Sequence, residues 1–283
     1  MEIKEYTFNP GAVVLNYAKV SSPGRPLVLL HGGNARWQSF ESIIPDLAPT
    51  WHVYAPDFRG QGKSGWVPGS YRLQDYTDDT IAFLRHHIHE PTCLFGHSLG
   101  GIVALMVAAQ YPEGVHAVAV GDAPLSRQTW HEHLLQGHAR IAAWRDLCGG
   151  QKSLDQLIEI LKDAPIEVPD KSEPVPMREA MGEDAPVYAW LAANLYQSDP
   201  DMLTAILEQH WNGSLLDSLQ TVLNFARTMT YNGVPPVVEV VSRTYQTGVK
   251  LSQKAMAKLE NRFERLPGLE KYFVRIVPLS SLL

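Results

Sequence analysis

The segment Phe95-Gly96-His97-Ser98-Leu99-Gly100-Gly101 decides the fold of this chain. It joins a short apolar run at 92–95, typical of a buried strand, to an apolar segment at 101–110 that predicts a helix. The chain must turn sharply between them, which forces the central serine into a strained backbone conformation. The flanking glycines leave room for strand and helix to approach. Glycine-rich turns also occur in nucleotide sites, but GHSLGG has neither the dinucleotide nor the P-loop spacing.

Strand-like and helix-like patterns alternate around this segment over the first 124 residues. Alternation of this kind predicts a parallel sheet with helices on both faces. The predicted fold is therefore α/β, with a mostly parallel central sheet. The expected strands are 12–20, 27–30, 51–55, 92–95 and 115–120, and the expected helices are 71–89 and 101–110.

The pattern changes after residue 124. Residues 125–217 show no strand pattern and predict a helical cap, with helices at 128–146, 153–162, 177–195 and 199–211. Strand patterns return at 237–241 and 272–277, with a helix between them at 251–265. We therefore expect a first part of the core at 1–124, a cap at 125–217 and an atypical second part of the core at 218–283, which lacks the usual terminal helix.

Three motifs resemble those of the α/β-hydrolase family. His31-Gly32-Gly33 follows the apolar run 27–30 as the family's HG motif follows its third strand. The segment 57–64, DFRGQGKS, resembles the family's D-x-R-G-x-G-x-S loop, and Asp57, Arg59 and Ser64 are expected to tie down that loop. Ser98 falls at the nucleophile position of a G-x-S-x-G elbow. The resemblance is close over residues 10–124. The cap resembles the family's helical lid only in its place in the sequence, and the resemblance of residues 218–283 is weak.

The resemblance implies a role for each matched residue. Ser98 would attack a carbonyl carbon and form an acyl-enzyme. The backbone N–H groups of Leu99 and Gly33 would form the oxyanion hole. His31 is expected to hold the oxyanion loop, and His97 to be structural, pointing away from the serine. A serine nucleophile disfavours epoxide hydrolases and haloalkane dehalogenases, which use aspartate there.

The other two members of a catalytic triad do not stand where the resemblance places them. The acid is expected after the strand 237–241, where the only carboxylate is Glu239, within the strand. The histidine is expected after 272–277, but all 11 histidines lie at or before His210. Asp122, after the strand 115–120, is an alternative acid. It can equally have the structural role of capping the turn that leads into the helical segment 125–217. The cap histidines are His131, His133, His138 and His210, and one of them would have to lie over Ser98 to act as base.

Charge separates the same C-terminal segment from the rest. Residues 218–283 carry nine Lys or Arg against four Glu, a net charge of +5, whereas residues 1–217 carry 15 against 26 acidic residues, a net charge of −11. One interpretation is that this tail derives from an altered reading frame, a splice variant or a truncation of a working hydrolase. The helical and strand patterns within it count partly against that interpretation.

Composition excludes several classes of protein. The chain has 283 residues, 45% of them apolar and 19% charged, which suits one large domain with an insertion. The net charge of −6 argues against a nucleic-acid binder, and no run of residues has the length of a membrane span. Two cysteines and no leader sequence predict a cytoplasmic location. No metal or cofactor is implied, and the oligomeric state is not readable.

Two functions remain open on the sequence. The first is a serine hydrolase that acts on a small, apolar carboxylic ester or related acyl compound. The second is a catalytically impaired pseudo-hydrolase that binds a ligand or protein partner, because the C-terminal histidine is missing.

Overall fold

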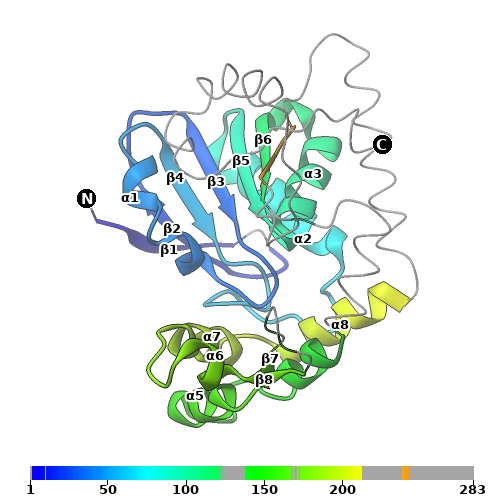
Figure 1. Cartoon of the computed structure of the whole chain (residues 1–283). Helices are drawn as coiled ribbons and strands as arrows, with labels where there is room; N and C mark the ends of the chain where they lie inside the picture. The colour runs from blue at the N-terminus through cyan, green and yellow to red at the C-terminus, as the bar shows by residue number, and fades with distance from the viewer. Residues whose placement is uncertain are drawn as a thin grey trace, which may run out of the picture.

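The computed structural model describes residues 2–9, 11–121, 123, 138–166, 168, 171, 173–211 and 238–241 (Figure 1). The described strands form a seven-stranded sheet with the order β1-β2-β4-β3-β5-β6-β9. From β4 to β9 neighbouring strands are parallel, whereas β1, β2 and β4 pair antiparallel. This arrangement confirms the predicted α/β fold with a mostly parallel sheet. The strands are β1 Lys4–Phe8, β2 Leu15–Val20, β3 Pro26–Leu30, β4 His52–Pro56, β5 Thr92–His97, β6 Val115–Gly121 and β9 Val238–Val241.

Helices cover both faces of the sheet, and the central strands are apolar on both sides for that reason. Val28 and Leu30 of β3 pack in one cluster with side chains of α2 and α3. Leu27 and Leu29 pack in the other cluster, beneath α1 and the 3-10 turn Trp37–Phe40. The helices are α1 Ile44–Leu47, α2 Leu73–Phe83, which continues into the π-turn Leu84–Ile88, and α3 Leu99–Gln110.

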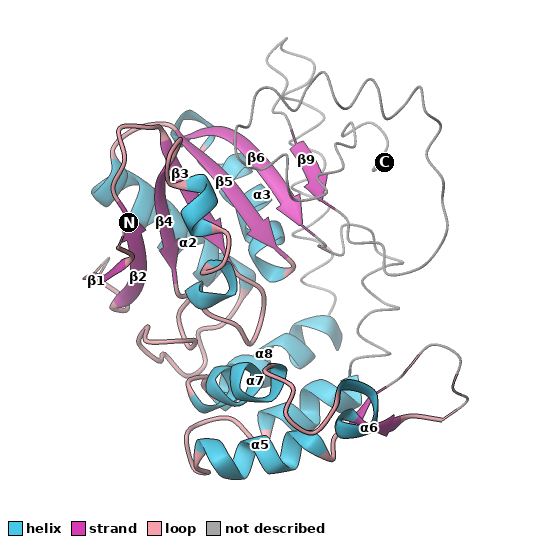
Figure 2. Cartoon of the chain, turned by 60° about the vertical axis from the view of Figure 1, so that its left-hand side comes forward, coloured by secondary structure: helices cyan, strands magenta, loops and turns pink. Residues whose placement is uncertain are grey.

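The cap lies beyond the edge of the sheet toward which the parallel strands point (Figure 2). Residues 138–145 are helical and are followed by α5 Leu154–Lys162, α6 Met177–Met181, α7 Val187–Tyr196 and α8 Pro200–Trp211. The prediction of one helix over 177–195 is wrong, because the chain leaves the helix at Gly182, which has φ +90°. The absence of strands is also wrong, since β7 Pro165–Ile166 pairs with β8 Val175–Pro176.

The structure tests part of the remaining predictions. β9 confirms the strand expected at 237–241 and pairs parallel with β6. The helix expected at 251–265 and the strand expected at 272–277 lie outside the described residues. β1 was not predicted, because four of its five residues are exposed and show no apolar alternation. None of the described helices has the length and apolar character needed to cross a bilayer.

A buried ion pair ties the loop after β4 to α2. Arg59 donates from Nε and Nη2 to the two carboxylate oxygens of Asp79, each at 2.6 Å, and both side chains are almost fully buried. Asp57, at the start of the same loop, accepts from the backbone N–H of Trp37 at 2.7 Å and of Lys63 at 3.0 Å. Ser64 Oγ in turn donates to the Asp57 carbonyl at 2.7 Å. The loop 57–64 is thus fixed by its own side chains.

His31 joins the end of β3 to the end of β4. The ring is fully buried, its Nε2 accepts from the backbone N–H of Phe58 at 3.0 Å, and its Nδ1 lies 2.8 Å from the Gly32 carbonyl. The bond from Phe58 requires an unprotonated Nε2, so the proton is on Nδ1, from which it is donated to Gly32. Burial, together with the neighbouring His97, lowers the pKa of His31 to about 4. The ring is therefore neutral at pH 7.

We predict that Asp79→Asn destabilises the protein by about 3–5 kcal/mol, because it leaves the buried Arg59 guanidinium without a counter-charge. Urea unfolding measures the loss. Asp78→Asn is the matched control, since Asp78 is the exposed neighbour on the same helix, and it should cost less than about 0.5 kcal/mol. Equal losses in the two variants would show that the buried Arg59–Asp79 ion pair contributes no more to stability than an exposed aspartate does.

His31 also gives stability a dependence on pH. Since its folded pKa of about 4 lies below the ordinary value of 6.5, the unfolded chain binds more protons between those values. Stability from this residue is complete above pH 6.5 and is lost as pH falls toward 4. Between pH 7 and pH 5 the free energy of unfolding should fall by roughly 2 kcal/mol. Urea unfolding of His31→Gln, which keeps an acceptor but does not titrate, should show a shallower slope; an unchanged slope would contradict the assignment.

Candidate active site

Ser98 stands on a sharp turn between β5 and α3. Its backbone has φ +52° and ψ −117°, a conformation that residues with a Cβ rarely adopt. A Cβ on Gly96 would lie 2.1 Å from the Gly100 carbonyl oxygen, and a Cβ on Gly100 would lie 2.1 Å from the Leu30 carbonyl oxygen. Only glycine fits at either position. The turn therefore has the geometry of a nucleophile elbow, with a half-buried serine at the carboxyl edge of the sheet.

The loop after β3 lies directly beside this serine. A Cβ on Gly32 would be 3.4 Å from the Ser98 Cβ, so Gly32 lies next to the Ser98 side chain. Gly33 follows in that loop, and Leu99 is the first residue of α3. The two residues expected to form an oxyanion hole thus belong to the two segments that flank Ser98.

Two of the described histidines, His31 and His97, lie against Gly32. His31 has both ring nitrogens engaged with backbone groups, so its ring has no nitrogen available to take a proton from Ser98. His97 is exposed, at the end of β5, and its Nδ1 would be 3.2 Å from a Cβ on Gly32. These positions fit the holding role expected for His31.

The remaining members of a triad are not placed by the structure. Asp122, His131 and His133 lie outside the described residues, as does the side chain of His210. His138 is described and is the first residue of the helical segment 138–145. Glu239 lies in β9, in register with Ala119 of β6.

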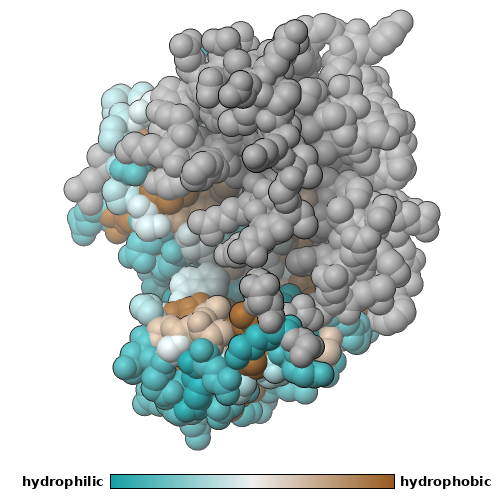
Figure 3. Space-filling view, in the orientation of Figure 1, coloured by the Kyte–Doolittle hydropathy of each residue, from teal (hydrophilic) through white to brown (hydrophobic). Residues whose placement is uncertain are grey.

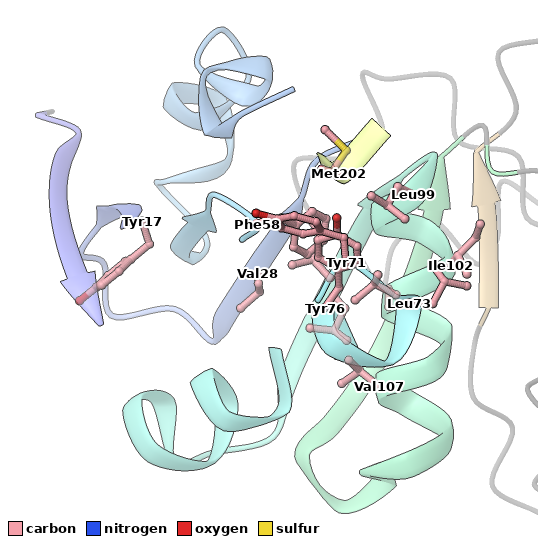
Figure 4. Close-up of a cluster of buried hydrophobic side chains, with 14 of the residues drawn as sticks. Tyr17, Val28, Phe58, Tyr71, Leu73, Tyr76, Leu99, Ile102, Val107 and Met202 are labelled. Atoms are coloured by element: carbon pink, nitrogen blue, oxygen red, sulfur yellow. The ribbon is translucent and has the colours of Figure 1, made fainter. Parts of the chain in front are cut away.

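Helix α8 of the cap covers the site with apolar side chains. The Cδ1 of Ile206 would lie 3.6 Å from a Cβ on Gly33. Met202 is fully buried in the same cluster as Leu99 and Tyr71, and Figure 4 shows these three side chains close to the start of α3. On the face shown in Figure 3, apolar surface lies where the cap approaches the core, while the outer cap is hydrophilic. The side chains of α8 that lie near the elbow are therefore partly apolar.

Polar contacts between cap and core, which the sequence did not indicate, lie in α7 and just before α8. Tyr71 donates to Asp199, and burial and this bond raise the pKa of Tyr71. The Asp199 N–H donates to the Gly60 carbonyl at 2.8 Å. Arg36 donates from Nε to Asn194 Oδ1 at 3.0 Å. Single polar residues in a loop and a cap helix carry no pattern that pairs them, since they are more than 120 positions apart in sequence.

In the part of the chain that the structure describes, no three side chains of His, Cys, Asp or Glu come together in a way that would hold a metal ion. Cys93 and Cys148 are both buried, and they form no disulfide with each other.

A family model described as the alpha/beta hydrolase fold matches residues 25–146. The pimeloyl-[acyl-carrier protein] methyl ester esterase of Neisseria meningitidis is 32% identical over 118 residues, which is 42% of this chain and 43% of that protein. The 2-(acetamidomethylene)succinate hydrolase of Mesorhizobium japonicum is 31% identical over 112 residues, 40% of each protein. The chain thus matches less than half the length of these curated relatives.

A second family model, described as a Rhodopirellula transposase DDE domain, matches residues 201–278. The match begins in α8 and covers the segment in which the sequence has neither the triad histidine nor an aspartate at the expected place. Most of that segment lies outside the described residues. The two models together indicate that the chain is similar to different families in its two parts.

Solved structures of low sequence identity share the fold. E-2-(acetamidomethylene)succinate hydrolase superposes with a TM-score of 0.62 at 20% identity, covering 93% of this chain and 100% of that one. The epoxide hydrolase of Vigna radiata superposes with a TM-score of 0.59 at 18% identity, covering 96% and 98%. These superpositions show that the chain has the α/β-hydrolase fold, and residues 25–146 are similar in sequence to the family of that fold.

Proposed function

We propose that this chain is a serine hydrolase that acts on a small carboxylic ester or related acyl compound. The observation that carries the proposal is the backbone of Ser98, held at φ +52° by the contact of Gly96 and Gly100 with their neighbours. Strain of this kind persists only where the surrounding structure enforces it, and it gathers at functional sites. The named activities of the relatives, a methyl ester esterase and an amide-bearing succinate hydrolase, support the same class of reaction.

The proposed reaction begins with attack of Ser98 Oγ on the carbonyl carbon of the substrate. The developing oxyanion would accept hydrogen bonds from the backbone N–H groups of Leu99 and Gly33. Collapse of the tetrahedral intermediate expels the alcohol and leaves an acyl group on Ser98, which water then removes. A base must take the serine proton, and the candidates are the cap histidines, with Asp122 as the acid that orients one of them.

The cap gives the proposal its substrate preference. Ile206 and Met202 of α8 lie over the oxyanion loop and the elbow. Apolar side chains in these positions favour an acyl or alcohol part with aliphatic carbon next to the reacting carbonyl. A small apolar acyl compound therefore fits better than a highly charged one at the reacting end.

We predict that a fluorophosphonate probe labels the protein on Ser98 at pH 7, because the elbow exposes an activated hydroxyl. Mass spectrometry of peptides from the labelled protein locates the adduct. Ser98→Ala should remove the adduct completely, whereas Ser21→Ala, at an exposed position far from the elbow in sequence, should keep it. No adduct on folded wild-type protein would contradict the proposal.

A second candidate is a catalytically impaired pseudo-hydrolase that keeps the binding site. It is favoured by the sequence after His210, which contains no histidine, and by the match of 201–278 to a transposase model. Loss of the triad histidine typically costs about 10⁶ in turnover and leaves roughly 10³–10⁴ over water. Under this candidate a ligand or a protein partner occupies the site without turnover.

Turnover of p-nitrophenyl butyrate separates the two candidates. A working hydrolase should show saturating turnover that Ser98→Ala reduces by about 10⁶, and a kcat/KM that rises with pH through the pKa of its base. An impaired protein should show turnover that differs by less than about tenfold between wild type and Ser98→Ala. His31→Gln measured alongside shows whether loss of the holding residue, rather than loss of a base, lowers the rate.

A further inference from the structure

Three buried carboxamides belong to one hydrogen-bond network where the cap joins the loop after β3, and among the described residues their amide nitrogens have no hydrogen-bond partner. Asn34, Gln61 and Asn194 are 5%, 0% and 1% exposed, and among the described residues their Nδ2 or Nε2 atoms have no hydrogen-bond partner. Buried polar groups in folded proteins are nearly always paired. Several unpaired donors in one place therefore point to an acceptor that binds there.

The orientation of two of these carboxamides is fixed by their partners. Gln61 Oε1 accepts from the backbone N–H of Ala35 at 3.1 Å, and Asn194 Oδ1 accepts from Arg36 Nε at 3.0 Å. Both partners can only donate, so turning either amide around would set one donor against another. Asn34 differs, because its partner Ser198 is a hydroxyl that can donate or accept. The inference therefore rests on Gln61 and Asn194.

Arg36 adds a positive charge to the same place. Its Nε binds Asn194 and its Nη1 lies 3.5 Å from Gln197 Oε1, both of them neutral amide oxygens. In the described part of the chain it forms no ion pair with a carboxylate, in contrast to Arg59 and Arg178. A half-buried guanidinium with only neutral partners keeps donors for a planar anion, and its fork matches a carboxylate.

Acidic groups nearby are already engaged. Asp199 accepts from Tyr71 and from the Asp201 N–H at 3.0 Å. Asp57 accepts from backbone groups on the far side of the loop, including Trp37 N–H at 2.7 Å. Neither carboxylate is bonded to Arg36, so the donors of this cluster are not neutralised from within the described chain.

The cluster lies next to the residues that flank Ser98. Asn34 directly follows Gly33, and Ser198, which binds Asn34 at 2.9 Å, comes shortly before α8, the helix whose Ile206 lies over Gly33. An acceptor bound by the cluster would therefore be part of a molecule that reaches the oxyanion loop. Its aliphatic carbons would lie under α8 and its polar end among the carboxamides.

We propose that Arg36, Gln61 and Asn194 form a carboxylate-binding subsite, and that the substrate is an acyl compound with a carboxylate a few atoms from the reacting carbonyl. The role of that carbonyl rests on the function proposed above, whereas binding of the carboxylate does not. The carboxylate accepts from Arg36 and from the two fixed amide N–H groups.

Calorimetry on the full-length Ser98→Ala protein tests the subsite without turnover. The probes are monomethyl succinate, which carries one carboxylate, and dimethyl succinate, which carries none. Monomethyl succinate should bind about 10- to 100-fold more tightly, the range expected for charge-assisted hydrogen bonds. Equal affinity for the two probes would overturn the proposal and leave the cluster as a site for ordered water only.

Three variants in the Ser98→Ala background locate the effect. Arg36→Gln should abolish the preference for monomethyl succinate, and Gln61→Glu should reverse it, because the new carboxylate keeps the acceptor for Ala35 but repels the anion. Arg25→Gln is the matched control, since it removes an exposed arginine at the opposite end of β3, and should change nothing. A preference that survives in both Arg36→Gln and Gln61→Glu would overturn the proposal.

Two further measurements keep the outcomes distinct. Thermal unfolding of each unliganded variant shows whether it is folded, and Gln61→Glu supplies the test where Arg36→Gln loosens the cap. Fluorophosphonate labelling of wild-type protein reports on Ser98 alone. Labelling without an anion preference refutes only the subsite, and an anion preference without labelling refutes only the hydrolase.

Discussion

The contact of the β5–α3 turn with the end of β3 is the constraint on which the rest of this structure depends. Gly96 packs its Cα against the Gly100 carbonyl, and Gly100 packs against the Leu30 carbonyl, at distances that exclude any side chain. Three backbone hydrogen bonds hold the turn: Ser98 N–H donates to the Gly121 carbonyl, and the N–H groups of Gly101 and Ile102 donate to the Ser98 carbonyl. The strained serine is thus supported from β3, β6 and α3 at once. Any looser packing would let its backbone relax and move the hydroxyl.

The loops around the serine are fixed by buried polar groups that cannot be exchanged for apolar ones. His31 stays neutral because burial lowers its pKa, and only the neutral ring accepts from Phe58. Asp57 and Arg59 act in the same way on the next loop, one through backbone N–H groups and one through Asp79. Each group is buried and paired, so the loops at the carboxyl edge hold one geometry.

The cap is joined to the core by two kinds of contact with different consequences. Apolar residues of α8 extend the main hydrophobic cluster. Their burial favours contact between cap and core, but it does not fix the position of the cap, because the hydrophobic effect is non-directional. The polar contacts at Arg36, Asn194 and Asp199 fix where the cap sits. In the same network the amide nitrogens of Asn34, Gln61 and Asn194 have no hydrogen-bond partner among the described residues.

The sequence by itself determined the elbow, the central strands and their apolar character on both faces, because these depend on local pattern: glycine spacing, short apolar runs and helical periodicity. It also showed that no histidine follows His210, since a count of residue types needs no structure. It did not give β1, whose exposed residues show no alternation, or the break at Gly182, where helical spacing continues across a φ of +90°. Only the tertiary structure decided which polar residues meet at the cap, because a contact between Arg36 and Asn194 depends on how two distant segments pack and leaves no trace in either one.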